Sequence, residues 1–140
     1  LKAVQERLVL LVLGDGPHRW RLERFRDQVR IRDRVRFLGI QPSTTEILRG
    51  CDCLWHATAH RNHYAQSILE AMANGTPVVV SDVEAHRRLI VSDETGWLVR
   101  PGDRAGYARK TMQLLANPEQ TRRVAQQAQQ LAVREFPPSG

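Results

Sequence analysis

The chain has 140 residues, of which 41 % are hydrophobic, so it is long enough to bury a core and has the composition of a globular domain. No apolar run approaches the ~20 residues of a membrane span, and the mixed segment after Lys2 predicts no signal peptide. The net charge of +6 favours anionic partners such as phosphates, nucleic acid or an acidic membrane surface, although a solvated polar face explains most of it. Cys51 and Cys53 lack the spacing of a disulfide framework or a zinc site, which predicts a reducing, cytoplasmic location.

Short apolar runs alternate with helical patterns along the chain. The runs predict strands at residues 8–13, 35–39, 51–57, 78–80 and 95–99. The helical patterns predict helices at residues 18–30, 44–49, 67–73, 84–91, 103–116 and 117–136, before a tail at 137–140. This alternation is typical of an α/β fold, a Rossmann-like parallel sheet with helices on both faces. Residues 1–7 have the pattern of a helix without a cap, so we expect a first strand to lie upstream.

In such sheets the ligand binds where the strands end at their carboxyl edge. Here those ends are Gly14-Asp15-Gly16, Gly39-Ile40, residues 57–64 and Ser81-Asp82. A Gly-Asp-Gly turn lets the backbone approach a phosphate, but taken alone it is more often a plain turn.

Arginine is concentrated in one segment of the chain. Eight arginines lie between Arg19 and Arg36, with Glu23, Asp27 and Asp33 among them. An RNA-binding motif is one reading of this segment. Pairing of the arginines with carboxylates four residues away explains it more simply, and no aromatic stacking platform accompanies it. Nucleic acid is therefore the less favoured partner.

The stretch from Asn62 to Val80 is the most informative in the sequence. Residues 67–73 are strong helix formers, Asn74-Gly75 is typical of a helix end, and Pro77 prevents the helix from continuing into the strand that follows. Glu70 lies on this helix roughly opposite its apolar residues. From the sequence alone, an exposed helix carboxylate is the simpler interpretation of Glu70.

Several of these segments together resemble a known family. The series LVLGDGP, VRFLGI, SILEAMANGTPVVVSDV, TGWLVRPGD and LLANPE resembles the carboxyl-terminal domain of the GT-B, family 4-like retaining glycosyltransferases. The resemblance implies that residues 1–136 are an amino-terminally truncated domain that binds a nucleotide-diphosphate sugar and needs no metal cofactor. A separate amino-terminal domain would hold the acceptor, a glycan or a lipid-linked molecule. Together with the charge, it places the protein in the cytoplasm at the inner membrane face.

The resemblance also assigns roles to individual residues. Glu70 would accept hydrogen bonds from the ribose hydroxyls, and Gly14, Asp15 and Gly16 would approach the nucleotide through their backbone. The helix start would present free N–H groups and a partial positive charge to the diphosphate. The residues concerned there are His63, Tyr64, Ala65 and Gln66, with His60 as a further candidate to contact the sugar or diphosphate.

This sequence departs from the family pattern at four positions. Asn62 stands where the family has its first motif glutamate, so support for a developing positive charge on the sugar would be weaker. His63 and Ala65 replace glycines, and Arg88 replaces a glutamate. Asn62 is accordingly a doubtful catalytic residue. The alternative is a catalytically inactive relative that binds a nucleotide or a partner without transferring a sugar.

Overall fold

The computed structural model describes residues 8–14, 16–57 and 66–136. These residues belong to two compact units, an amino-terminal unit of residues 1–44 and a carboxyl-terminal unit of residues 45–140. Among the described residues, no helix is long and apolar enough to cross a membrane.

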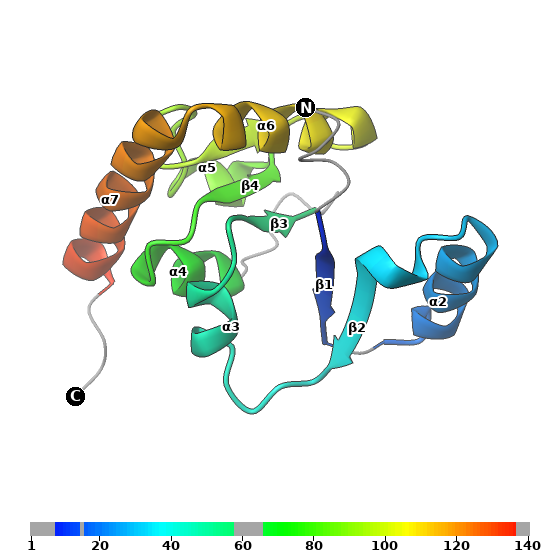
Figure 1. Cartoon of the computed structure of the whole chain (residues 1–140). Coiled ribbons are helices and arrows are strands. Elements are labelled where there is room, and N and C mark those ends of the chain that lie inside the picture. The colour runs from blue at the N-terminus through cyan, green and yellow to red at the C-terminus, as the bar shows by residue number, and fades with distance from the viewer. Residues whose placement is uncertain (1–7, 15, 58–65, 137–140) are drawn as a thin grey trace. The chain divides into compact units, whose positions relative to one another are not determined.

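The amino-terminal unit is a strand–helix–strand motif (Figure 1). Its elements in order are β1 (Leu10–Leu13), α2 (Arg19–Gln28), the 3-10 helix η1 (Arg32–Arg34) and β2 (Val35–Gly39). β1 and β2 run parallel, with Leu10 opposite Val35. β1 is shorter than the predicted strand because the residues that would pair with Leu8 and Val9 belong to η1 and cannot extend the ladder.

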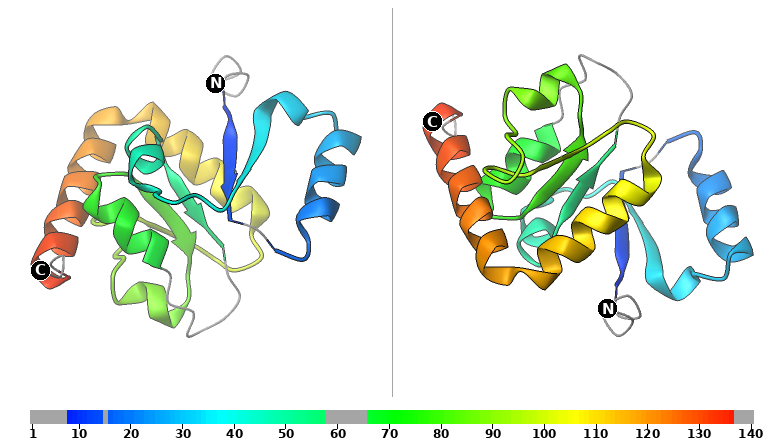
Figure 2. Two further views of the ribbon diagram at one scale, coloured as in Figure 1. Left: turned by 90° about the horizontal axis from the view of Figure 1, so that it is seen from below. Right: turned by 90° about the horizontal axis from the view of Figure 1, so that it is seen from above.

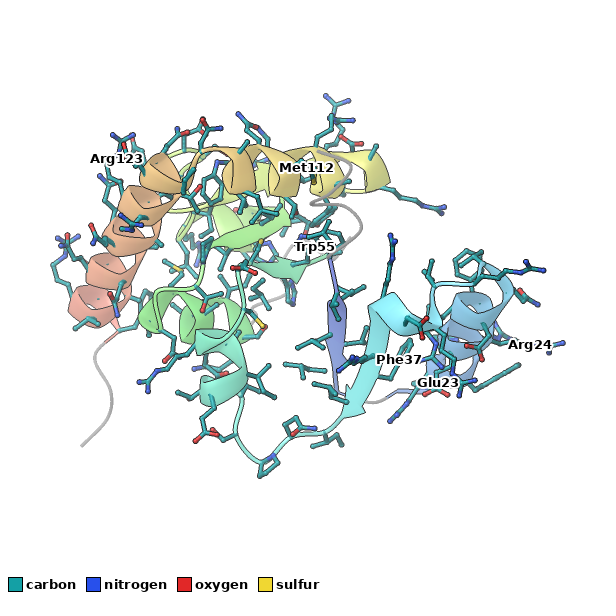
Figure 3. The ribbon with its side chains drawn as sticks, in the orientation of Figure 1. Glu23, Arg24, Phe37, Trp55, Met112 and Arg123 are labelled. Atoms are coloured by element: carbon teal, nitrogen blue, oxygen red, sulfur yellow. The ribbon has the colours of Figure 1, made fainter. Side chains whose placement is uncertain are left out.

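Helix α2 ends earlier than predicted. Arg30 has a positive φ of 60°, and the N–H of Ile31 donates to the Arg26 carbonyl while that of Arg30 donates to the Asp27 carbonyl. This is the Schellman motif, built here without a glycine. The guanidinium of Arg26 also lies 5.2 Å from the ring centre of Phe37, a side chain labelled in Figure 3.

The carboxyl-terminal unit contains a three-stranded parallel sheet in the order β3–β4–β5. Trp55, Val79 and Trp97 lie side by side across it. Its elements are α3 (Thr45–Arg49), β3 (Leu54–His56), α4 (Gln66–Ala73), β4 (Val78–Ser81), α5 (Glu84–Arg87), β5 (Trp97–Val99), α6 (Arg104–Ala116) and α7 (Pro118–Glu135).

Both faces of this sheet are covered by helices (Figures 1 and 2). Val78 and Val80 pack with α4 and the second half of α7, whereas Val79 packs with α6 on the other face. All three valines are at most 1 % exposed. Successive side chains of a strand point to opposite faces of the sheet, so their burial requires that both faces are covered. On the α6 face, the indole N–H of Trp55 donates to the Thr111 hydroxyl at 2.7 Å (Figure 3). The predicted fold class is confirmed within this unit.

The turn between α4 and β4 forms as predicted. Gly75 has a φ of 74°, the left-handed conformation that glycine adopts without a steric penalty. The N–H of Thr76 donates to the Ala71 carbonyl and that of Gly75 to the Met72 carbonyl, so α4 also ends in a Schellman motif. Pro77 then leads directly into β4.

Two predictions on helices were wrong in part. The helix expected at residues 84–91 is only α5, because the chain turns after Arg87 to bury Leu89 and Ile90, and Thr95 binds the backbone there. The pattern of residues 103–116 predicts Tyr107, Met112 and Leu115 as core contacts. Tyr107 is buried and the half-buried Leu115 packs against the core, whereas Met112 is only half-buried. The buried face of the helix consists of Tyr107, Thr111 and Leu114, which have i, i+4, i+7 spacing. The sequence predicts Asp103 as the cap of this helix, and the cap is confirmed, since the Asp103 carboxylate accepts from the Gly106 N–H at 3.0 Å.

Candidate functional site

The carboxyl edge of the three-stranded sheet is where the predicted ligand-binding residues of this unit lie. β3 ends there at His56, β4 ends there at Ser81, and α4 begins on the same edge at Gln66. Gln66 is exposed in the first turn of α4, one helical turn before Glu70. These two predicted residues are therefore neighbours on the helix surface at the predicted edge.

Glu70 is half-buried, not fully exposed as its place on the helical wheel suggested. The residues before and after it, Leu69 and Ala71, are both buried, so its carboxylate lies at the margin of the apolar face of α4. The adjoining backbone is fixed, because the Asn74 amide donates to the Glu70 carbonyl at 2.8 Å and itself accepts from Arg49. A carboxylate offers only hydrogen-bond acceptors, and two oxygens in a fixed position suit a pair of hydroxyl donors.

Gly14 and Gly16, the two described residues of the predicted Gly-Asp-Gly turn, follow β1 in the amino-terminal unit. Gly14 has a φ of 92°, and its N–H donates to the Gly39 carbonyl at 2.8 Å. A side chain at Gly14 or Gly16 would meet no atom within 4 Å, so the backbone is accessible at both positions. The conformation of Gly14 favours glycine over any residue with a side chain.

Several predicted site residues lie outside the described residues. These are Asp15, His60, Asn62, His63, Tyr64 and Ala65. Their assignments remain predictions.

Asp82, the first residue after β4, is engaged with its neighbours. Its N–H donates to the Val99 carbonyl at 2.7 Å, and its carboxylate forms a 2.5 Å ion pair with Arg87. The hydrogen bond with Asp82, together with its negative charge, raises the pKa of Arg87. Asp82 therefore ties the end of β4 to α5 and β5.

Two buried polar residues, neither of which the sequence placed at the candidate site, also contact this edge. His86 Nδ1 lies 2.7 Å from the Ser81 carbonyl oxygen, and the Tyr107 hydroxyl donates to the His56 carbonyl at 3.2 Å. Tyr107 is 51 positions from its partner in sequence, so no local pattern could have predicted this contact.

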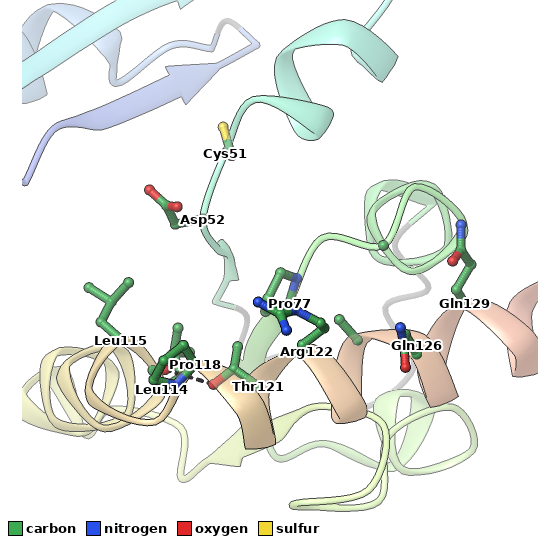
Figure 4. A pocket seen from close by; sticks show the side chains of 12 residues that line it. Cys51, Asp52, Pro77, Leu114, Leu115, Pro118, Thr121, Arg122, Gln126 and Gln129 are labelled. Atoms are coloured by element: carbon green, nitrogen blue, oxygen red, sulfur yellow. Dashed lines mark hydrogen bonds between the residues drawn. The ribbon is translucent and has the colours of Figure 1, made fainter.

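A cavity of about 360 Å³ opens at the opposite edge of the sheet (Figure 4). Asp52 precedes β3 and Pro77 precedes β4, so the cavity adjoins the amino ends of these strands. In parallel α/β sheets that edge is not where ligands usually bind. Cys51 and Gly75, which lie in the connections before β3 and β4, also line the cavity. The other residues of its wall come from α6 and α7: Leu114, Leu115, Pro118, Thr121, Arg122, Ala125, Gln126 and Gln129.

The described residues include no group of three or more histidine, cysteine or acidic side chains that could hold a metal ion. The expectation that the site works without a metal remains a prediction.

Comparison with known proteins identifies the family. The family model described as glycosyl transferases group 1 matches residues 1–131, which is nearly the whole chain. The chain belongs to this family. It is 32 % identical over 127 residues to an N-acetyl-alpha-D-glucosaminyl L-malate synthase of Bacillus anthracis and, over the same length, to the lipopolysaccharide core biosynthesis glycosyltransferase LpsE of Rhizobium meliloti. Both alignments cover 91 % of this chain but only 33 % and 37 % of the relatives, so the group 1 chain spans about a third of their length.

Solved structures confirm the GT-B glycosyltransferase fold of this group 1 chain. Anabaena Alr3699/HepE, solved in complex with UDP-glucose, matches with a TM-score of 0.87 at 24 % identity over 91 % of this chain and 36 % of its own. The carboxyl-terminal domain of the group 1 glycosyl transferase LpcC from Francisella tularensis matches with a TM-score of 0.76 at 25 % identity. That match covers 91 % of this chain and 69 % of the LpcC domain, consistent with a carboxyl-terminal position in the whole enzyme.

Proposed function

We propose that residues 1–136 are the donor-binding, carboxyl-terminal domain of a longer, family 4-like retaining glycosyltransferase. It would bind a nucleotide-diphosphate sugar, and the complete enzyme would transfer the hexosyl group to a glycan or lipid-linked acceptor held by its amino-terminal domain. Membership of the group 1 family supports this proposal, as does the share of about a third of each relative that the chain spans. A structural neighbour with UDP-glucose bound supports the class of donor. The fragment alone would bind the donor without turning it over.

The position of Glu70 is the single observation that carries the proposal. Its carboxylate is half-buried on α4, at the edge of the sheet where ligands of α/β folds bind. The two oxygens would accept hydrogen bonds from the 2′ and 3′ hydroxyls of the ribose. Because Asn74 holds the backbone around Glu70, α4 would present the carboxylate to the diol from a fixed backbone position.

The start of α4 would act on the other end of the donor. Free N–H groups at a helix start, with the partial positive charge of the helix dipole, favour an anion there. Negative charge grows on the departing nucleotide diphosphate as the bond to the sugar breaks, so this interaction would strengthen in the transition state. Gln66 is in the first helical turn and is exposed to such a ligand.

Calorimetric titration of the chain with UDP, GDP and their sugars tests the donor role. We expect a micromolar Kd for one nucleotide and a loss of at least about tenfold in Glu70→Ala, since a hydrogen bond to a charged group contributes roughly 1.5–3 kcal/mol. Glu70→Gln keeps the size of the side chain and removes its charge. Glu119→Ala, at an exposed position in α7, is the matched control and should leave the Kd unchanged. Equal affinity of the wild type and Glu70→Ala would refute the ribose role.

A catalytically inactive, nucleotide-binding relative is the second candidate, and Asn62 is the observation that favours it. Asparagine is uncharged and would stabilise a developing positive charge on the sugar less than glutamate does. In the complete enzyme, Asn62→Glu separates the two functions. Activity in the wild type would support the transferase, whereas activity only in the variant would support the inactive relative.

We also propose that the protein works in the cytoplasm beside an acidic membrane surface. Residues 1–44 have ten basic and five acidic side chains, while residues 45–140 have eleven and ten. Nearly all of the net charge of +6 therefore belongs to the first 44 residues. Co-sedimentation with phosphatidylglycerol vesicles, lost in salt and absent with phosphatidylcholine, would support this site of action. Equal sedimentation with both lipids would contradict it.

A further inference from the structure

The ends of β3 and β4 are held together by two side chains that contact both of them. His86, on α5, places Nδ1 2.7 Å from the carbonyl oxygen of Ser81, the last residue of β4. Its ring also meets the ring of His56, the last residue of β3, edge to face, with 5.4 Å between centroids and 82° between planes. A single imidazole thus touches both strand ends.

Tyr107, on α6, contacts the same two residues. Its hydroxyl donates to the His56 carbonyl at 3.2 Å and is hydrogen-bonded to the Ser81 side chain. Burial raises the pKa of Tyr107, and the hydrogen bond with Ser81 only partly offsets this effect. The phenol therefore stays protonated and able to donate at physiological pH.

These contacts reach the strand ends from opposite faces of the sheet. Side chains alternate along a strand, so His56 points to the same face as Leu54, which packs with α4, and His86 meets it there. The Ser81 side chain shares the face of Val79, where Tyr107 belongs to the core under α6. One polar residue on each face therefore joins the same pair of strand ends.

The geometry also fixes the role of one ring nitrogen of His86. A carbonyl oxygen can only accept, so Nδ1 must donate to Ser81. The side chain is 1 % exposed, and Nε2 is buried with no hydrogen-bond partner among the described residues. Burying such a group costs free energy, which an aliphatic residue at this position would not require.

We propose that His86 and Tyr107 form a two-sided clamp that positions the donor site. The clamp sets the spacing between the ends of β3 and β4. The segment leading to α4 and Glu70 departs from the β3 end, and Asp82 follows the β4 end. His86 and Tyr107 are positioning residues in this role, acting through the strand ends and not by touching the donor. The inference rests on the proposed donor-binding function.

Three variants of the full chain test the clamp. His86→Leu removes the imidazole, Tyr107→Phe removes only the hydroxyl, and His86→Asn retains a short N–H donor for the Ser81 carbonyl. We expect UDP to bind about tenfold more weakly to His86→Leu and Tyr107→Phe, because small displacements at a binding site have large effects. His86→Asn should recover most of the affinity. Because both residues hold the same strand ends, the loss in the double variant should be smaller than the product of the two single losses.

Nuclear magnetic resonance of the histidine ring nitrogens provides a readout that a purely structural role would not change. Long-range proton–nitrogen spectra should show His86 as the Nδ1–H tautomer, and adding UDP should shift the signals of both His86 and His56. Thermal unfolding of each variant measures the stability change separately from affinity. Tyr107→Phe keeps the aromatic core intact, so it tests the clamp even if His86→Leu does not fold.

The outcomes distinguish the clamp from the function on which it rests. If the wild type binds neither UDP nor GDP, the proposed function fails and the clamp fails with it. If the wild type binds UDP while Tyr107→Phe and the folded His86 variants bind it equally well, the clamp alone is overturned. A lowered melting temperature with unchanged affinity would likewise reduce both residues to ordinary core contacts. Weaker binding in a variant whose melting temperature is unchanged is the result expected for the clamp.

Discussion

Gly106 lies in the first turn of α6, where the neighbouring atoms leave no room for a side chain. A Cβ there would come within 2.6 Å of the Asp103 carboxylate and 2.7 Å of the Val99 side chain. Gly106→Ala should gain up to about 1 kcal/mol in helix propensity, but overpacking costs roughly 1–3 kcal/mol. We therefore expect a net loss of about 1 kcal/mol in the free energy of unfolding, measured by urea titration. Gly50→Ala is the control, since its Cβ would meet no atom closer than 3.6 Å. Equal stability of the two variants would show that the turn adapts.

The two cysteines should react slowly with alkylating reagents in the folded protein. Burial, reinforced by the charge of Asp52, raises the pKa of Cys53 to about 12, and the same two causes raise the pKa of Cys51. Only the thiolate is nucleophilic, so at pH 8 almost all of Cys53 is unreactive. Iodoacetamide followed by mass spectrometry should modify both residues in urea. In the native protein Cys53 should be protected most, and its labelling should rise with pH. Rapid native labelling of Cys53 at pH 8 would contradict its burial.

At the scale of elements, Thr76 links the α4–β4 turn to α3. Its hydroxyl is buried and donates to the Leu48 carbonyl at 2.7 Å. Thr76→Val keeps the shape of the side chain but removes this hydrogen bond. The Leu48 carbonyl then keeps only its hydrogen bond from the Cys51 N–H at 3.1 Å, so we expect a loss of about 0.5–1.5 kcal/mol, the net contribution of one hydrogen bond. Thr76→Ser retains the hydroxyl and is the matched control. We expect chemical denaturation to place the serine variant close to the wild type and well above the valine variant. A valine variant as stable as the serine variant would mean that this bond adds little.

Elements with strong local signals were predictable from the sequence. Helix α4, its end at Gly75 and the buried strand β4 formed as expected, because helix formers, a left-handed glycine and a β-branched run all specify the same structure. The Asp103 cap of α6 formed for the same reason. The predicted pairing of arginines with carboxylates four residues away also forms in part, since Arg19 and Glu23 make an i,i+4 ion pair at 2.8 Å.

Features that depend on tertiary contacts were not predictable. Residues 18–30 have the pattern of an amphipathic helix with Leu22 and Phe25 on its apolar face, yet these two side chains are 52 % and 60 % exposed. The pattern shows that a helix is amphipathic, but it does not show which surface covers the apolar face. The contacts of His86 and Tyr107 with His56 were not predicted, because His56 is on a different element and lies 51 positions from Tyr107 in sequence. At the candidate site, the position of Glu70 was foreseen, whereas its half-burial depends on how α4 packs.

At the scale of the whole molecule, the two units differ in how much side-chain surface they bury. Among the described residues of the amino-terminal unit no side chain is buried, whereas in the carboxyl-terminal unit β4 is buried throughout. Backbone amides of weakly packed regions exchange through local opening, while core strands open only with the whole fold. Hydrogen exchange should therefore be fast in β1 and β2 and slow in β4, with protection differing by at least about a hundredfold.

The same measurement tests whether an upstream strand belongs to this fold. In the described residues β1 pairs only with β2, and β3 pairs only with β4, so each strand has one edge without a ladder partner. Parallel strands of α/β folds are normally buried between neighbours and helices.

If the complete enzyme supplies the predicted first strand, the amides of β1 should become protected in the longer protein, and those of β4 should change little because they are already in the core. The exposed hydrophobic side chains of Leu8, Val9 and Leu10 should become less accessible at the same time. If the exchange of the β1 amides is unchanged in the complete enzyme, the upstream strand does not pair with β1. The amino-terminal unit would then be weakly packed even in the longer protein.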